Sequence, residues 1–153
     1  TALIALAHAG GLRVYATSRD ESKRARALEL GADEVFDSNA RLPRKVDAVM
    51  ETVGAATWSH SLRSLRPGGR IVISGATSGP NPDKTELNRI FFLQLEVIGS
   101  TMGTRSELAS LVDLLDVSGV RPVIDRVLPM TEAREGFAAM AGGDVFGKVV
   151  FTR

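Results

Sequence analysis

The side chains that most often carry catalytic or metal chemistry are few in this sequence and poorly spaced for it. His8 and His60 are the only histidines, and they fall in different predicted helices with no carboxylate pattern to complete a metal site. Asp47 and Glu51 lie at opposite ends of one predicted strand, so they cannot meet across a substrate. The absence of cysteine excludes a thiolate nucleophile, a disulfide framework and a cysteine-ligated zinc. We therefore expect no catalytic residue and no metal ligand in this chain.

The elements that would position a binding site alternate between strand and helix. The predicted strands are residues 13–17, 34–36, 46–50, 70–74, 96–99, 123–127 and 147–151. The predicted helices are residues 1–9, 22–30, 57–65, 83–93, 106–117 and 131–140. Ala25 and Leu28 are expected to face inward, and Pro67-Gly68-Gly69 is expected to form a turn. This alternation is typical of β-α-β units around a parallel sheet, whose strand at 46–50 would be covered on both faces.

Composition favours one ordinary globular domain. Of 153 residues, 44% are hydrophobic and 24% charged, and the net charge is +1. Charges of both signs are interspersed, so no basic stripe indicates nucleic acid and no lysine-rich flank indicates a membrane surface. No apolar run approaches the roughly 20 residues of a membrane span. With cysteine absent, we expect a cytoplasmic protein with no nucleic-acid or membrane partner.

Five stretches, in register along the chain, carry a family resemblance. They are Val-Asp-Ala-Val-Met-Glu-Thr-Val-Gly at 46–54, Leu-Arg-Pro-Gly-Gly-Arg-Ile-Val-Ile-Ser-Gly at 65–75, and the segments 29–35, 98–104 and 147–151. Together they resemble the C-terminal nucleotide-binding domain of the medium-chain dehydrogenase/reductase superfamily, which includes zinc-type alcohol dehydrogenases and quinone oxidoreductases. The resemblance implies an α/β fold over residues 1–153, with a Rossmann-like doubly wound parallel sheet.

The resemblance also implies which cofactor is bound. NAD-binding members carry an acidic residue after the first strand of this segment, where it accepts hydrogen bonds from the adenosine ribose. The corresponding residue here is Ser18, followed by Arg19 and, one helical turn on, Lys23. A carboxylate would repel a 2′-phosphate, whereas a hydroxyl and two cations would hold it, so NADP is expected over NAD. The alternative is that Arg19 and Lys23 are solvated surface charges.

Further cofactor contacts are implied at the carboxyl ends of the strands, where open parallel sheets bind ligands. Contacts to the ribose or nicotinamide would come from Thr52, Val53, Gly54, Gly75, Ala76, Thr77, Ser100 and Thr101. A glycine such as Gly75 allows the backbone to approach a flat ring closely. Lys148 would meet phosphate or ribose, or else be a surface lysine.

The sequence departs from the family at its start. The glycine-rich fingerprint and the strand before it do not occur, and Thr1 would fall just after the last fingerprint glycine. We therefore expect a fragment without its first strand and without the N-terminal catalytic domain, which would hold any zinc. The missing strand would lie between the strands at 13–17 and 46–50. Such a fragment should be inactive alone.

Three functions remain open. The first is hydride transfer between NADP(H) and a small-molecule carbonyl, alcohol or activated alkene. The second is an S-adenosylmethionine-dependent methyltransferase, which shares the Leu-x-Pro-Gly-Gly turn but also requires an acid where Ser18 stands. The third is a non-catalytic association module. Family members often form homodimers through sheet edges, for which the strands at 96–99 and 123–127 are candidates.

Overall fold

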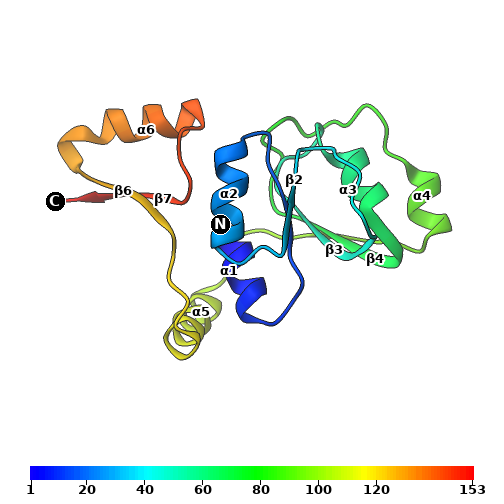
Figure 1. Ribbon diagram of the computed structural model, residues 1–153, viewed down its shortest axis with the longest axis horizontal. Coiled ribbons are helices and arrows are strands. Elements are labelled where there is room, and N and C mark those ends of the chain that lie inside the picture. The colour runs from blue at the N-terminus through cyan, green and yellow to red at the C-terminus, as the bar shows by residue number, and fades with distance from the viewer. The chain divides into compact units, whose positions relative to one another are not determined.

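The computed structural model describes residues 1–153, which form two compact units. Unit 1 comprises Thr1–Val35 and Arg105–Arg153, and unit 2 comprises Phe36–Thr104. The strands hydrogen-bond within three separate sheets, β1-β2, β3-β4-β5 and β6-β7 (Figure 1). Every helix is too short or too polar to traverse a bilayer.

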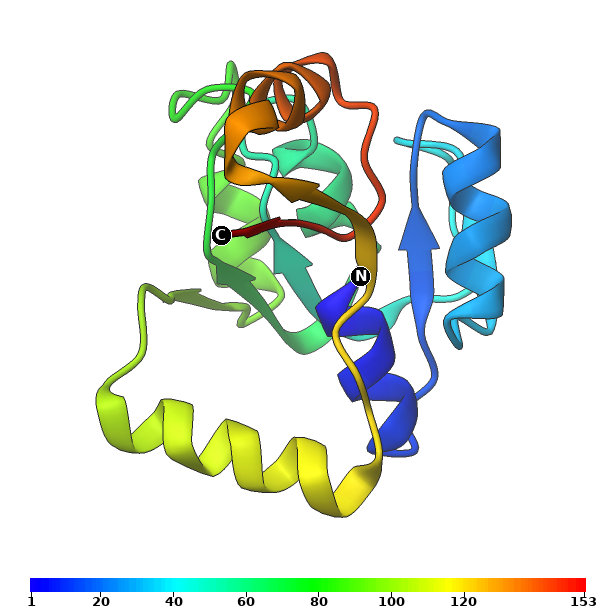
Figure 2. The same cartoon turned by 90° about the vertical axis from the view of Figure 1, so that its left-hand side faces the viewer.

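The first part of unit 1 is a short β-α-β segment preceded by a helix. Its elements are α1 (Ala2–Ala9), β1 (Tyr15–Thr17), α2 (Glu21–Glu29) and β2 (Glu34–Phe36). The side chain of Asp20 accepts the backbone N–H of Lys23 and so caps the start of α2, which runs alongside β1 (Figure 2). This start sets the helical phase so that Ala27 is buried. The prediction that Ala25 and Leu28 face inward is wrong, because both are exposed.

The second part of unit 1 contains two paired strands and a helix that packs on them. Its elements are α5 (Arg105–Ser118), β6 (Ile124–Pro129), the 3₁₀ turn η1 (Met130–Glu132), α6 (Ala133–Gly142) and β7 (Lys148–Thr152). β6 and β7 are parallel, and α6 packs on both. Gly136 is buried where α6 meets β7, and a Cβ there would lie 2.6 Å from Cζ of Phe151. Only glycine therefore allows α6 to approach the sheet this closely.

Unit 2 is a parallel three-stranded sheet with two helices. Its elements are β3 (Val46–Glu51), α3 (Trp58–Ser64), β4 (Leu65–Ile73), α4 (Leu87–Phe92) and β5 (Glu96–Gly99). The strand order is β3-β4-β5, and α3 packs across β3 and β4 (Figure 1). The core consists of buried side chains from α3, β4 and the residue before β5, namely Leu62, Leu65, Ile71 and Leu95. The predicted α/β, Rossmann-like architecture with parallel strands is confirmed.

The structure corrects two details of strands β3 and β4. The strand β3 has only β4 as a partner, and Ala48 and Met50 are exposed, so β3 is not covered on both faces as predicted. The segment 66–69 interrupts the pairing of β4 with β3 and does not simply separate helix from strand. Val46 pairs with Leu65 and Ala48 with Arg70, so the four residues between Leu65 and Arg70 loop out opposite Asp47.

The structure also corrects the start of α4. The helix that was predicted over residues 83–93 begins only at Leu87. Glu86, the residue before it, has a φ of 54°, in the left-handed region. A right-handed helix cannot continue back through such a residue, so the segment that precedes it runs as an irregular loop.

Candidate nucleotide-binding site

Ser18 lies in the turn between β1 and α2, which is fixed by local hydrogen bonds. The Ser18 hydroxyl accepts the N–H of Asp20 at 3.1 Å, and Arg24 Nη1 donates to the Ser18 carbonyl at 2.6 Å. One oxygen of Asp20 accepts the Lys23 N–H at 3.1 Å and the Ser22 hydroxyl at 2.7 Å. A hydroxyl that accepts one hydrogen bond keeps its own proton to donate, so Ser18 can still serve a ligand.

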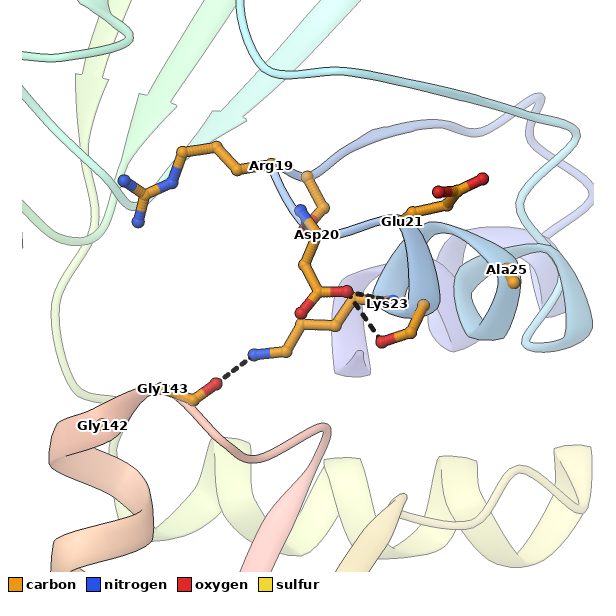
Figure 3. Close-up of a pocket in the computed structure, with 9 residues that line it drawn as sticks. Arg19, Asp20, Glu21, Lys23, Ala25, Gly142 and Gly143 are labelled. Atoms are coloured by element: carbon orange, nitrogen blue, oxygen red, sulfur yellow. Dashed lines mark hydrogen bonds between the residues drawn. The ribbon is translucent and has the colours of Figure 1, made fainter.

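The structure brings Ser18, Arg19 and Lys23 to one open hollow of about 950 Å³ in unit 1. Gly142 and Gly143, at the end of α6, form its other side (Figure 3). The Lys23 ammonium donates to the Gly143 carbonyl. Figure 3 shows the Arg19 guanidinium extended, with no hydrogen bond to the other residues drawn. Ser18, Arg19 and Lys23 thus line one hollow, where the Lys23 ammonium contacts Gly143 and the Arg19 guanidinium points away from it.

Two carboxylates also line this hollow, which the sequence reasoning missed. Neither Asp20 nor Glu21 was predicted as a site residue, and both line the hollow. The hydrogen bond from the Ser22 hydroxyl, and next that from the Lys23 N–H, hold the pKa of Asp20 below its usual range. Asp20 is therefore ionised at neutral pH, but one of its oxygens is already occupied in capping α2. Aspartate is common at helix N-caps, so the sequence alone gives no reason to place Asp20 in a binding pocket.

Lys148 opens β7 and lies near the start of α1. Its N–H donates to the Val123 carbonyl at 2.8 Å, and Gly147 before it has a φ of +125°. Gly147 and Thr1 line the same cavity of about 320 Å³. Lys148 follows Gly147 directly, and its charge acts on Thr1, the residue before α1. A cation is thus available beside the first turn of a helix, where anions are favoured.

The other predicted contacts lie in unit 2, at the carboxyl edge of its sheet. The Ser74 N–H donates to the Glu51 carbonyl at 2.9 Å, and the Ser100 N–H donates to the Ile73 carbonyl at 2.8 Å. The pairing of the strands therefore continues past their ends, so the segments that follow β3, β4 and β5 begin side by side. Ser100 and Thr101 are exposed there.

The loops after β3 and β4 are tied together. The N–H and the hydroxyl of Ser78 both donate to the Val53 carbonyl at 2.7 Å. A Cβ at Gly54 would lie 2.6 Å from the Gly79 carbonyl oxygen, and one at Gly75 would lie 2.8 Å from that of Thr52. Glycine at position 75 therefore serves a close approach to backbone, where the sequence suggested approach to a flat ring. Ala76 and Thr77 lie exposed within the second loop.

Glu51 is a buried carboxylate that the sequence reasoning set aside. Its residue is 3% exposed, and its oxygens accept hydrogen bonds from Val53, Gly54, Thr57 and Ser61. Burial by itself raises its pKa, but these hydrogen bonds outweigh burial and hold the pKa below its ordinary value. The sequence feature that could have indicated this site is the pair of hydroxyl residues Thr57 and Ser61, which lie one helical turn apart at the start of α3.

The chain contains no cluster of side chains that could bind a metal ion. No group of three or more histidine, cysteine, aspartate or glutamate side chains could hold an ion. His60 Nε2 lies 2.8 Å from the Ala40 carbonyl, and the His8 ring packs beside Gly31. Asp47 pairs with Arg66 at 2.6 Å on the surface, away from Glu51.

Parallel strands with hydroxyl-bearing and small residues at their carboxyl ends define a Rossmann-like nucleotide-binding domain. The family model of the zinc-binding dehydrogenases matches residues 1–117. The chain belongs to this family, and it corresponds to the C-terminal, nucleotide-binding domain.

Individual relatives differ in reaction and cofactor. Acryloyl-coenzyme A reductase of Sulfurisphaera tokodaii is 28% identical over 96% of this chain and 45% of its own. The crystal structure of an NAD-dependent alcohol dehydrogenase superposes with a TM-score of 0.88, at 32% identity over 99% of this chain and 47% of that one. A mycobacterial protein solved with NADPH gives a TM-score of 0.81, at 25% identity over 99% and 52%. The chain spans about half the length of the curated relatives it matches.

Proposed function

We propose that the chain is the nucleotide-binding part of an NADP(H)-dependent oxidoreductase, in which hydride passes to or from a carbonyl, an alcohol or an activated alkene. NADPH would supply the hydride, and the residues of this chain would hold and orient it. The relatives' titles name both NAD and NADPH, so the preference must be argued from this chain's own side chains.

The observation that carries the proposal is the hollow lined by Ser18, Arg19 and Lys23. NAD-binding members of the family place a carboxylate at the position of Ser18, and a carboxylate there would repel a 2′-phosphate. A hydroxyl with a proton to donate and two cations match the acceptors and charge of a phosphate. Asp20 and Glu21 bring two negative charges to the same hollow, and one Asp20 oxygen is engaged in capping α2, so Arg19 and Lys23 must outweigh them for a phosphate to bind.

The remaining predicted residues receive roles group by group. Lys148, beside the first turn of α1, is assigned to the pyrophosphate, because helix starts and cations both favour anions. In unit 2 we assign the ribose and nicotinamide to the small and hydroxyl residues after the strands, namely Thr52, Val53, Gly54, Gly75, Ala76, Thr77, Ser100 and Thr101. None of these side chains can polarise a carbonyl as a metal would, so the chain alone should not catalyse turnover.

The proposal includes a homodimer in the cytoplasm that acts on a small molecule, with no nucleic-acid or membrane partner. β5 pairs only with β4, and all four of its residues are exposed, so its outer edge is free to pair with a second copy. β6 likewise pairs only with β7. Light scattering on the full-length protein tests this part, and a strict monomer at micromolar concentration would count against it.

The experiment that tests the cofactor preference is Ser18→Asp in the full-length protein, titrated with NADPH and NADH by calorimetry. A carboxylate at this position should lower the affinity for NADPH by about tenfold or more and raise that for NADH, because it repels phosphate and accepts ribose hydroxyls. A general loss of folding would lower both affinities and is thereby distinguished. An unchanged ratio of the two affinities would reject the proposed role of Ser18.

A further inference from the structure

The carboxylate of Glu51 is buried in unit 2, at the last residue of β3. It directly precedes the loop of Thr52, Val53 and Gly54. A buried carboxylate is costly unless its lone pairs are satisfied by hydrogen bonds. The groups that donate hydrogen bonds to Glu51 therefore indicate its role.

The two oxygens of Glu51 serve two different segments. Oε1 accepts the N–H of Val53 at 2.7 Å, the N–H of Gly54 at 3.0 Å and the Thr57 hydroxyl at 2.9 Å. Oε2 accepts the Ser61 hydroxyl at 2.5 Å and the Thr57 hydroxyl at 3.0 Å. One oxygen thus holds the loop, while the other is anchored to α3.

These hydrogen bonds determine which groups of the loop face outward. With the N–H groups of Val53 and Gly54 turned inward to Glu51, the Val53 carbonyl receives both donors of Ser78. Gly54 is held at a φ of +93°. The side chains of Thr52 and Val53 are left exposed. The loop is therefore clamped between Glu51 and the loop after β4.

We propose that Glu51 is a positioning residue that presents the Thr52–Gly54 loop to the bound nucleotide. This role rests on the proposed function, which assigns that loop to the ribose and nicotinamide. Glu51 touches no ligand itself. It fixes two peptide N–H groups, and through them the exposed face of the loop.

A purely structural carboxylate would act differently. Its loss would lower the melting temperature, and nucleotide affinity would fall only as far as it does for any variant equally destabilised. A positioning residue changes affinity beyond that amount. It also changes amide exchange at the two residues whose N–H groups it holds.

The test compares four variants of the full-length protein. Glu51→Ala removes every contact, and Glu51→Gln keeps an oxygen acceptor for the loop in a nearly identical shape. Asp47→Asn is the matched control, because it makes the same change from carboxylate to amide on the same strand, at a side chain 81% exposed. Leu62→Ala, at a fully buried core position, is the control for lost stability.

Three quantities are measured for each variant: the dissociation constant for NADPH, the melting temperature, and amide hydrogen exchange at Val53 and Gly54. For Glu51→Ala we expect faster exchange at both amides and a dissociation constant raised about tenfold, as for the loss of a charged hydrogen-bond acceptor. Glu51→Gln should lie between it and the unmodified protein, so the test holds if the alanine variant does not fold. Asp47→Asn should match the unmodified protein.

Two results would overturn the proposal while the proposed function stands. One is unchanged NADPH affinity in both Glu51 variants. The other is an equal loss of affinity in Leu62→Ala at an equal loss of melting temperature. Failure of the unmodified protein to bind either NADPH or NADH would instead overturn the proposed function, and this proposal with it.

Discussion

Replacing Arg19 by alanine tests the electrostatics of the hollow. The guanidinium is exposed and extends without a hydrogen bond to the other residues drawn in Figure 3, so its loss should not disturb the fold. A cation about 4 Å from one phosphate charge gains about 1 kcal/mol in water and about 4 kcal/mol near a protein surface. Hydrogen bonds to charged groups contribute about 1.5–3 kcal/mol, which corresponds to about 10- to 100-fold in the dissociation constant. NADH lacks the 2′-phosphate and should lose less than about twofold.

Calorimetry at two salt concentrations measures this difference. The loss for NADPH should shrink at high salt, because exposed charges are screened. Arg13→Ala is the matched control, since it removes the same charge from unit 1 at an exposed residue outside the hollow. Equal losses for NADPH and NADH, or equal losses in the Arg13 and Arg19 variants, would show that Arg19 does not hold the 2′-phosphate.

Three further predictions concern charge and backbone. The pKa of Glu51 in the folded protein lies below its ordinary value. The ionised carboxylate therefore stabilises the fold at neutral pH, and this stabilisation is lost as the pH falls through the folded pKa. The gap in melting temperature between the unmodified protein and Glu51→Gln should therefore narrow in acid, and a gap that widens would contradict this. Gly31→Ala should cost about 2–4 kcal/mol by denaturant titration, from a strained φ of +106° and a Cβ 2.5 Å from the His8 ring. Gly68→Ala, with a φ of +71° and open space around it, should cost only about 1–2 kcal/mol, so equal costs would reject the steric argument. Lys148→Ala should weaken NADPH and NADH alike, because both carry the pyrophosphate, and a loss confined to NADPH would remove the pyrophosphate assignment.

The sequence predicts the order and type of the elements well, because periodicity and capping are local properties. The strand at 34–36 and the helix that opens after Asp20 lie where their patterns place them. The start of α4 was mispredicted because it depends on the left-handed backbone of Glu86, a residue type that rarely adopts it. The interruption of β4 at residues 66–69 was missed because it depends on pairing with β3, which is not a local property.

In the candidate site, too, residues close in sequence were predictable and residues brought together only by the fold were not. That Ser18, Arg19 and Lys23 line one hollow could be expected from the sequence, because they lie within six residues of one another around the start of α2. The role of Glu51 was missed because its partners lie in a loop and on α3, and only the fold turns their donors toward one carboxylate. Gly142 was also missed as a wall of the hollow, since it is distant in sequence from α2.

In the proposed function, a hydroxyl and two cations replace a carboxylate where the adenosine end of a dinucleotide binds. Calorimetric titration of the unmodified full-length protein with NADPH, NADH and S-adenosylmethionine tests it most directly. We expect NADPH to bind at least about tenfold more tightly than NADH, and S-adenosylmethionine not to bind. Tighter binding of NADH would contradict the phosphate assignment, and binding of S-adenosylmethionine alone would contradict the oxidoreductase function.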